Sequence, residues 1–342
     1  MKSKSDIRSR IGAVAPTARL SWLWPLAIAC ILGVSVAANE GAAQEPGYPR
    51  KPIHWIVPNA AGSPLDINIR KIASVVSRKM NATIVIENRV GASGVIGANE
   101  VARAAPDGYT FLATTADPLI ASTALKAAPY DPNRDFSFIT KIIAGNTPLA
   151  VRSDLKIKTL PELIAAAKTR PLTYASFGPG SFPQLTMEEL NRVAGIKIGE
   201  VAYRSPPQAI QALLQGEVDI SSLSPAQALE YTAQGKVFLL ASPARSPLFP
   251  DMPSFADAGF NTTILNTRLW VGLLGPAGLP PRIADTMLAA IRSAFEEEEL
   301  KAFFRATGSG IVINTPTEFE REFRTEHDAV VPFIKGLGIA QQ

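Results

Sequence analysis

Hydrophobic positions in the first third of the chain follow two alternating periods. Short apolar, β-rich runs at 52–58, 83–87 and 110–114 predict buried strands. Between them, apolar residues recur every three or four positions, which predicts helices at 67–80 and 98–105. This alternation indicates a parallel sheet with helices on both faces, in which ligands bind at the carboxyl ends of the strands.

A second series of the same kind begins after Leu149. Its predicted strands are 173–175, 198–202, 218–221 and 237–241, and its predicted helices are 160–168, 185–193, 209–215 and one starting at Pro225. The chain then returns through an apolar strand at 269–274 and a helix at 281–295. We therefore expect an α/β protein of two lobes with two crossings, the first lobe comprising 48–150 plus 269–342 and the second 151–268. A cleft between two lobes is a usual place for a small ligand, and hinge closure is the motion it allows.

The N-terminal segment has the order of a secretory signal peptide. A basic, polar stretch at 1–19 precedes an apolar run at 20–38, and small residues follow up to Ala43. We expect residues 1–43 to be a cleaved signal peptide and the protein to be exported to the periplasm. The alternatives are an uncleaved membrane anchor and lipidation at Cys30, although Ala27 stands where a lipobox usually has Leu.

Composition excludes several classes of function. The chain has one Cys and two His, too few for a disulfide scaffold or a His/Cys zinc site. Its formal charge of +4 falls to about +1 once the basic leader is set aside, which gives no electrostatic footprint for nucleic acid. No nucleophile elbow, P-loop or H-E-x-x-H motif occurs. The sequence therefore predicts no enzyme activity, no metal and no cofactor.

Two loops carry the candidate binding chemistry. Residues 59–66 and 176–184 each join a predicted strand to a helix and are rich in small residues and hydroxyls. A helix start offers unpaired backbone N–H groups and a partial positive charge, which suit a carboxylate or phosphate. The alternative for the first loop is ordinary capping by Ser63 or Asp66. For Arg89, the alternative to anion binding is a surface ion pair.

Five segments together resemble one known family. They resemble the extracytoplasmic solute receptors of tripartite tricarboxylate transporters, called Bug receptors, and they are YPRKPIHWIVPNAAGSPLDI (48–67), ENRVGASGVIGANEVARAAPDGYT (87–110), LTYASFGPGSFPQL (172–185), VAYRSPPQAIQALLQGEVDI (201–220) and ASPARSPLFPDMPSFADAGF (241–260). The resemblance implies a two-lobed periplasmic binding protein of type II, each lobe a mainly parallel sheet flanked by helices. It also implies capture of a small organic carboxylate for a membrane permease, without enzymatic activity. We expect a monomer.

The resemblance carries over to positions in both loops and beyond them. The first-lobe loop is matched by Ala61, Gly62, Ser63 and Asp66, the second-lobe loop by Ser176, Gly178, Gly180 and Ser181, and the end of a Val-Asp strand by Asp219. The full predicted ligand-binding set adds neighbouring residues of the same loops and strand ends: Asn59, Thr115, Phe182, Tyr203 and Ser222.

The sequence departs from the family pattern inside the pocket. Ser63 replaces a second Gly, and Pro64 removes a possible N–H donor. Phe182 and Leu223 favour a ligand with an apolar or aromatic body, whereas Ser221, Ser222 and Ser224 favour a polar one. We expect a di- or aromatic carboxylate as ligand and the permease subunits of a tripartite tricarboxylate transporter as partners. The alternatives are a ligand-sensing receptor that signals to a membrane partner and an exported enzyme on the same scaffold.

Overall fold

The computed structural model describes residues 47–125, 128–203 and 205–338, and the chain from Tyr48 onward forms one compact unit. The predicted signal peptide, with Cys30, lies outside the described residues. Among those residues, no helix is both long and apolar enough to cross a membrane.

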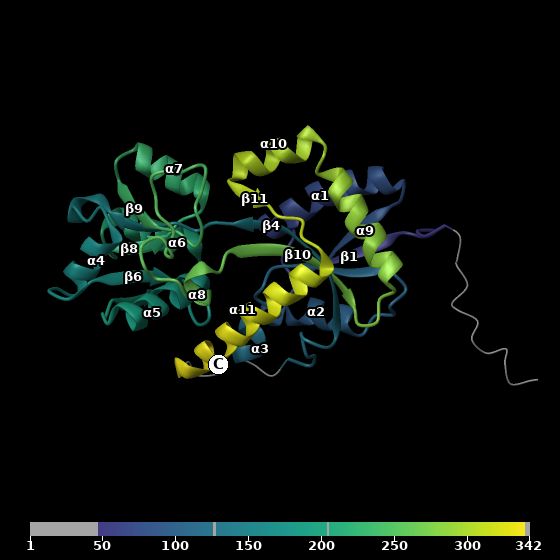
Figure 1. Ribbon diagram of the computed structural model, residues 1–342, viewed down its shortest axis with the longest axis horizontal. Coiled ribbons are helices and arrows are strands. Elements are labelled where there is room, and N and C mark those ends of the chain that lie inside the picture. Colours follow the sequence, from purple (N-terminus) through teal and green to yellow (C-terminus); the bar gives the residue numbers. More distant parts are fainter. Residues whose placement is uncertain (1–46, 126–127, 204, 339–342) are drawn as a thin grey trace, which may run out of the picture. The chain divides into compact units, whose positions relative to one another are not determined.

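The first lobe is built on a six-stranded sheet (Figure 1). Across the sheet the strands are β11 (Ser309–Ile311), β4 (Phe136–Gly145), β10 (Leu269–Pro276), β3 (Thr110–Thr114), β1 (Ile53–Val57) and β2 (Ile84–Asn88). Strand β1 pairs in parallel with β2 and β3. Strands β4, β10 and β11 join through antiparallel pairs.

Helices cover both faces of this sheet. One face packs against α1 (Pro64–Met80), α9 (Pro281–Ala294) and α10 (Glu298–Thr307), and the other against α2 (Val95–Ala102), α3 (Ala121–Leu125) and α11 (Pro316–Gly336). A 3₁₀ turn at Ala92–Gly94 precedes α2.

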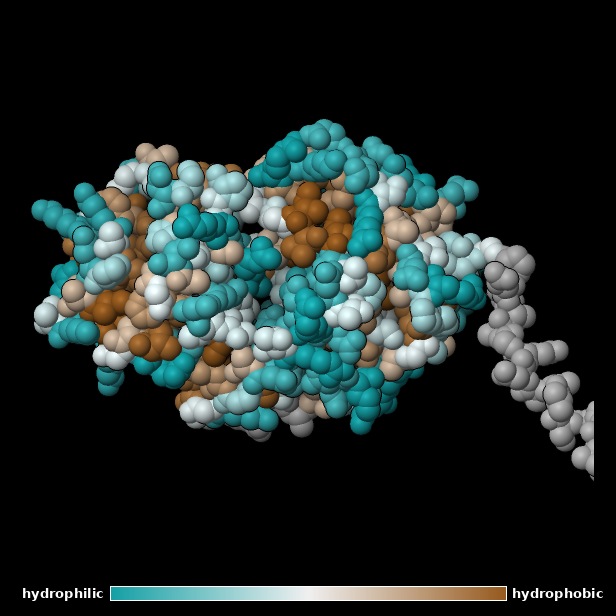
Figure 2. All heavy atoms as spheres, viewed as in Figure 1, coloured by the Kyte–Doolittle hydropathy of each residue, from teal (hydrophilic) through white to brown (hydrophobic). Residues whose placement is uncertain are grey.

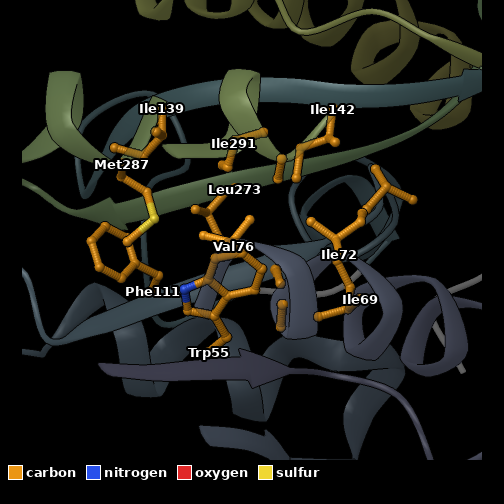
Figure 3. Close-up of a cluster of buried hydrophobic side chains, with 14 of the residues drawn as sticks. Trp55, Ile69, Ile72, Val76, Phe111, Ile139, Ile142, Leu273, Met287 and Ile291 are labelled. Carbon is orange, nitrogen blue, oxygen red and sulfur yellow. The ribbon is translucent and has the colours of Figure 1, made fainter. Parts of the chain in front are cut away.

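The core of the first face shows how the sequence pattern produces this packing. Trp55 of β1, Phe111 of β3, Val76 of α1 and Met287 of α9 belong to one cluster of fully buried side chains, in which Figure 3 shows Phe111 beside Met287 and Trp55 beside Val76. Burial of each such side chain contributes roughly 1.5–3 kcal/mol. The core thus holds β1 and α1 in a fixed relation, and with them the loop that joins the two.

The second lobe has a five-stranded sheet with the same kind of cover. Its strands, in order across the sheet, are β7 (Gly199–Ala202), β6 (Thr173–Ser176), β8 (Ile220–Ser222), β5 (Leu149–Arg152) and β9 (Val237–Ala241). One face packs on α4 (Leu160–Ala167) and α5 (Phe182–Ala194), and the other on α6 (Pro206–Gln215) and α7 (Pro225–Ala233). A 3₁₀ turn at Ser153–Leu155 follows β5, and the short helix α8 (Thr263–Asn266) precedes β10.

Two crossings connect the sheets. The first runs from β4 to β5 through residues 146–148, and the second runs from α8 into β10. Helix α11 packs along β4 and also contacts α3 and α8, so it follows the crossing strands from one lobe to the other. The lobe boundaries stay a prediction.

The two-lobed α/β fold predicted from the sequence is confirmed, and both expected parallel strand sets are present. Each sheet is mixed, because the crossing strands β4, β5, β9 and β10 pair antiparallel to their neighbours. Several helices begin about three residues earlier than the apolar spacing indicates. In α1 and α6 this is because Pro64 and Pro206 occupy the first helical position, which proline favours.

Candidate functional site

The first predicted loop is a tight turn at the carboxyl end of β1. Gly62 has a left-handed backbone conformation, with φ of 78°, and Ser63 is the N-cap of α1. The Ser63 hydroxyl accepts the N–H of Asp66 at 3.3 Å. Residues 59–62 at the tip of the turn are exposed.

The buried carboxylate of Asp66 stabilises this turn through hydrogen bonds. Its carboxylate accepts hydrogen bonds from the Gly62 N–H at 2.8 Å, from Arg70 Nε at 2.9 Å and from Asn88 Nδ2 at 2.9 Å. Burial by itself raises the pKa of Asp66, but these hydrogen bonds outweigh it and the pKa lies below its usual value. Asp66 therefore carries a negative charge at the start of α1 and occupies the Gly62 N–H, so that donor is not available to a ligand.

The second predicted loop repeats the geometry of the first. Gly180 has φ of 74°, and its N–H donates to Gln184 Oε1 at 2.8 Å, as Gly62 donates to Asp66. Ser181 is the N-cap of α5, and its N–H donates to the Gly178 carbonyl at 3.1 Å, as Ser63 donates to Ala60 at 3.1 Å. The two lobes thus present one turn type at corresponding strand ends.

The two turns differ in charge and in capping. At the start of α5 the neutral Gln184 replaces the carboxylate of Asp66. The Ser181 hydroxyl does not cap α5 but accepts the Phe177 N–H at 3.2 Å, which leaves its hydrogen free to donate. With no side-chain cap, the positive end of α5 is the better place for an anion.

Glu200 on β7 stabilises the second turn through hydrogen bonds. Its two carboxylate oxygens accept from the Ser176 hydroxyl and, at 2.9 Å, from Gln184 Nε2. Ser176 in turn accepts the Gly178 N–H at 3.1 Å. Sequence reasoning missed Glu200 and Asn88 as supports of the loops, since both come from neighbouring strands.

The second turn touches the first lobe. A Cβ atom added to Gly180 would lie 2.9 Å from Leu125 Cδ1 and 3.6 Å from Ala121 Cβ, both on α3. Helix α3 follows the carboxyl end of β3, next to Thr115, whose hydroxyl donates to Asp117 at 3.3 Å. The turn at Gly180 therefore faces the same edge of the first sheet that carries the turn at Gly62.

The other predicted residues differ in how far they are exposed near the two turns. Phe182 is half-buried in the first turn of α5, and Ser222 is buried at the carboxyl end of β8. Asn59 accepts a hydrogen bond from Asn88 Nδ2 through its carbonyl at 2.9 Å. Leu223 is fully buried in the core of the second lobe, so it does not line a pocket and does not support the prediction of an aromatic ligand.

The structure places Asp219 away from the two turns, and we correct that assignment. Asp219 precedes β8 and accepts from Arg152 at 2.9 Å and from the Thr173 N–H at 2.9 Å, at the opposite end of β6 from Ser176. Tyr203 lies beside the second turn: its N–H donates to the Ser176 carbonyl at 3.0 Å, and its side chain lines a hollow beside α6 and interacts with Glu217.

Two residues outside the loops have structural partners. Arg89 pairs with Glu87 and, at 3.0 Å, with Glu100, so the surface ion-pair interpretation of this residue holds. Ser224 caps α7 in a capping box with Gln227, which occupies its hydroxyl.

Comparison with known proteins agrees with this architecture. A family model described as a tripartite tricarboxylate transporter family receptor matches residues 68–338. Protein BugT of Bordetella pertussis is 30% identical over 298 residues, which cover 84% of this chain and 90% of BugT.

Two solved structures show a similar fold. MatC from Rhodopseudomonas palustris, solved with bound malate, is 26% identical with a TM-score of 0.67, and 84% of this chain covers 100% of it. Rpa4515 of R. palustris, solved with adipate, is 26% identical with a TM-score of 0.69, and 86% of this chain covers 99% of it. The resemblance to Bug receptors is therefore confirmed: the chain belongs to the tripartite tricarboxylate transporter receptor family.

Proposed function

We propose that the protein is a periplasmic receptor that captures one small organic carboxylate between the turns at Gly62 and Gly180 and delivers it to a tripartite tricarboxylate transporter. The observation that carries this proposal is the repeated turn: both lobes place a Gly-Ser helix start at the carboxyl edge of a sheet. The protein binds this carboxylate without converting it.

The ligand carboxylate binds at the second turn. At the start of α1 the Asp66 carboxylate already occupies the Gly62 N–H, whereas α5 lacks a side-chain cap and offers the hydroxyl hydrogen of Ser181. The first turn then supplies its exposed tip, residues 59–62, to cover the ligand.

The ligands of two structural relatives agree with a carboxylate ligand. The structures of MatC and Rpa4515 hold malate and adipate, which are both small dicarboxylates. We infer that the ligand of this chain is also a small dicarboxylate, held through N–H and O–H donors.

A ligand screen tests the proposal. The protein is heated in the presence of malate, adipate, succinate and benzoate, and hits are titrated by calorimetry. We expect one dicarboxylate to raise the melting temperature and bind with one-to-one stoichiometry, because a ligand bound only to the folded state stabilises it. Binding of amines or sugars instead of any carboxylate would contradict the proposal.

A further inference from the structure

A polar hollow of about 430 Å³ lies between α11, α8 and the crossing strands, and we call it the hinge pocket. It is lined by residues from β4, β10, α8, α11 and the segment before β10, among them Lys141, Asn266, Arg268, Trp270, Arg321 and Glu326. None of the predicted ligand-binding residues lines it. Figure 2 shows a largely hydrophilic surface over α11, which agrees with the polar lining.

The hinge pocket has an excess of positive groups. Among the described residues, the guanidinium groups of Arg268 and Arg321 form no hydrogen bond or ion pair, and Arg321 has only a longer-range electrostatic interaction with Glu318. Lys141 is the third cation, and its Nζ lies 2.7 Å from Glu322 Oε2. Two unpaired guanidinium groups on one hollow favour a small anion with several oxygen atoms.

The acidic residues of the pocket do not cancel this charge. Glu326 is buried and accepts the Trp270 Nε1–H at 2.9 Å. Desolvation raises the pKa of Glu326 to about 7, so the side chain is partly neutral at physiological pH. The Glu322 carboxylate is shared between Lys141 and, at 3.3 Å, Asn314 Nδ2.

A second observation bears on the ligand's chemistry. Asn266 Oδ1 is buried without a hydrogen-bond partner, while its Nδ2 donates to Asn261 Oδ1 at 2.7 Å. A buried acceptor without a donor destabilises the folded state, and an O–H group on a ligand would satisfy it. The lining of the pocket therefore favours a ligand with negatively charged oxygen atoms next to the two arginines and a hydroxyl group next to Asn266.

We propose that the hinge pocket is a second ligand site, which binds a small oxyanion carrying an O–H group. Hydrogen phosphate and small hydroxycarboxylates share this chemistry. Because Asn266 comes from α8 and Arg321 from α11, the bound anion contacts both of these helices. The site does not depend on the proposed function of the two turns.

Calorimetry with inorganic phosphate and sulfate tests the site. Phosphate keeps an O–H group at pH 7 and sulfate does not, so we expect phosphate to bind at least fivefold more tightly. Malate against succinate is the corresponding pair for the hydroxycarboxylate source, and only the part of their binding that the double variant below abolishes counts for this site. Tighter binding of phosphate than of malate by this measure assigns the site to phosphate, and the reverse assigns it to a hydroxycarboxylate. Either order supports the site.

Matched variants locate the binding. The double variant Arg268→Gln/Arg321→Gln should weaken phosphate binding more than tenfold, whereas Arg282→Gln, which removes an exposed charge on α9, should leave it unchanged. Ser181→Ala should not alter phosphate affinity, which separates this site from the turn at Gly180. Absence of phosphate and malate binding, or equal affinity in the double variant and the native chain, would overturn the proposal.

Discussion

Gly62 and Gly180 are equivalent residues in the two lobes. Each has a positive φ, 78° and 74°, and each donates its N–H at 2.8 Å to the side chain four positions later. The equivalence means that one turn, used twice, places a helix start from each lobe at the candidate binding edge. The two turns differ in what surrounds them, and most of the predictions below use that difference.

Gly180→Ala should destabilise the protein more than Gly178→Ala does. Both residues have positive φ, so an alanine costs about 1 kcal/mol in either place. Only at Gly180 does the added Cβ meet a neighbour, Leu125 Cδ1 at 2.9 Å, whereas nothing lies within 4 Å at Gly178. Because Cδ1 is the flexible end of the Leu125 side chain, we expect an extra loss of only about 1 kcal/mol from this overpacking, measured by denaturant unfolding.

A double-mutant cycle that combines Gly180→Ala with Leu125→Ala tests the cause of this extra loss of stability. Shortening Leu125 should remove most of the difference between Gly180→Ala and Gly178→Ala, because the clash is with the end of a flexible side chain. Strictly additive effects of the two substitutions would show that the turn does not touch α3 in solution.

Ser181→Ala should weaken carboxylate binding by about 1–3 kcal/mol, since the variant loses a donor to a charged group. The Ser181 oxygen already accepts from Phe177, so its hydrogen is the part available to the ligand. Ser224→Ala is the matched control, because that hydroxyl caps α7 instead. Calorimetry with the ligand found in the screen measures both, and an equal effect of the two variants would argue against a direct role of Ser181.

Asp66→Asn should lower the free energy of unfolding by about 1–3 kcal/mol at pH 7, because three hydrogen bonds to a buried carboxylate are weakened. The folded-state pKa of Asp66 is depressed, so its stabilising contribution is present above the unfolded pKa of about 4 and is lost as the pH falls through the folded value. The difference between native and variant protein should therefore shrink between pH 5 and pH 3 in urea titrations. A constant difference over this range would contradict the assigned role.

Glu326→Gln should have the opposite pH dependence. The pKa of Glu326 is raised to about 7 by desolvation and by the charges of Asp117 and Glu322, against the Trp270 hydrogen bond and Lys141. An acid with a raised pKa destabilises the folded state increasingly as the pH rises from the unfolded value of about 4.5 through the folded value. We expect the variant to be more stable than the native protein at pH 8, by on the order of 1–3 kcal/mol, and nearly equal at pH 5. Thermal unfolding at both values measures it, and a less stable variant at pH 8 would refute this assignment.

The sequence contained a clear signal for both turns. Ser63 and Asp66, and likewise Ser181 and Gln184, are three positions apart, the spacing at which a side chain can reach back to the helix start. Local spacing of this kind can be predicted because all the partners lie within one turn of helix.

The supports of the turns could not be predicted in the same way. Glu200 and Asn88 reach the loops from neighbouring strands, and only the strand order of the folded sheet brings them there. Asp219 was misplaced for a related reason. The predicted strand began at residue 218, whereas β8 begins at Ile220, so Asp219 lies at the end of the sheet away from the turns.

Long-range pairing also explains the missed elements. Strand β4 (Phe136–Gly145) and helix α11 (Pro316–Gly336) are not part of a local strand–helix repeat. Their positions depend on contacts between residues distant along the chain: β4 pairs with β10, and α11 packs against α3.

The most direct test of the central claim is a crystal structure of the protein with the carboxylate found in the screen. We expect the ligand between the two turns, with a carboxylate oxygen within hydrogen-bond distance of the Ser181 hydroxyl and the first turn of α5. A carboxylate bound away from both turns, with the turns at Gly62 and Gly180 left open to solvent, would contradict it.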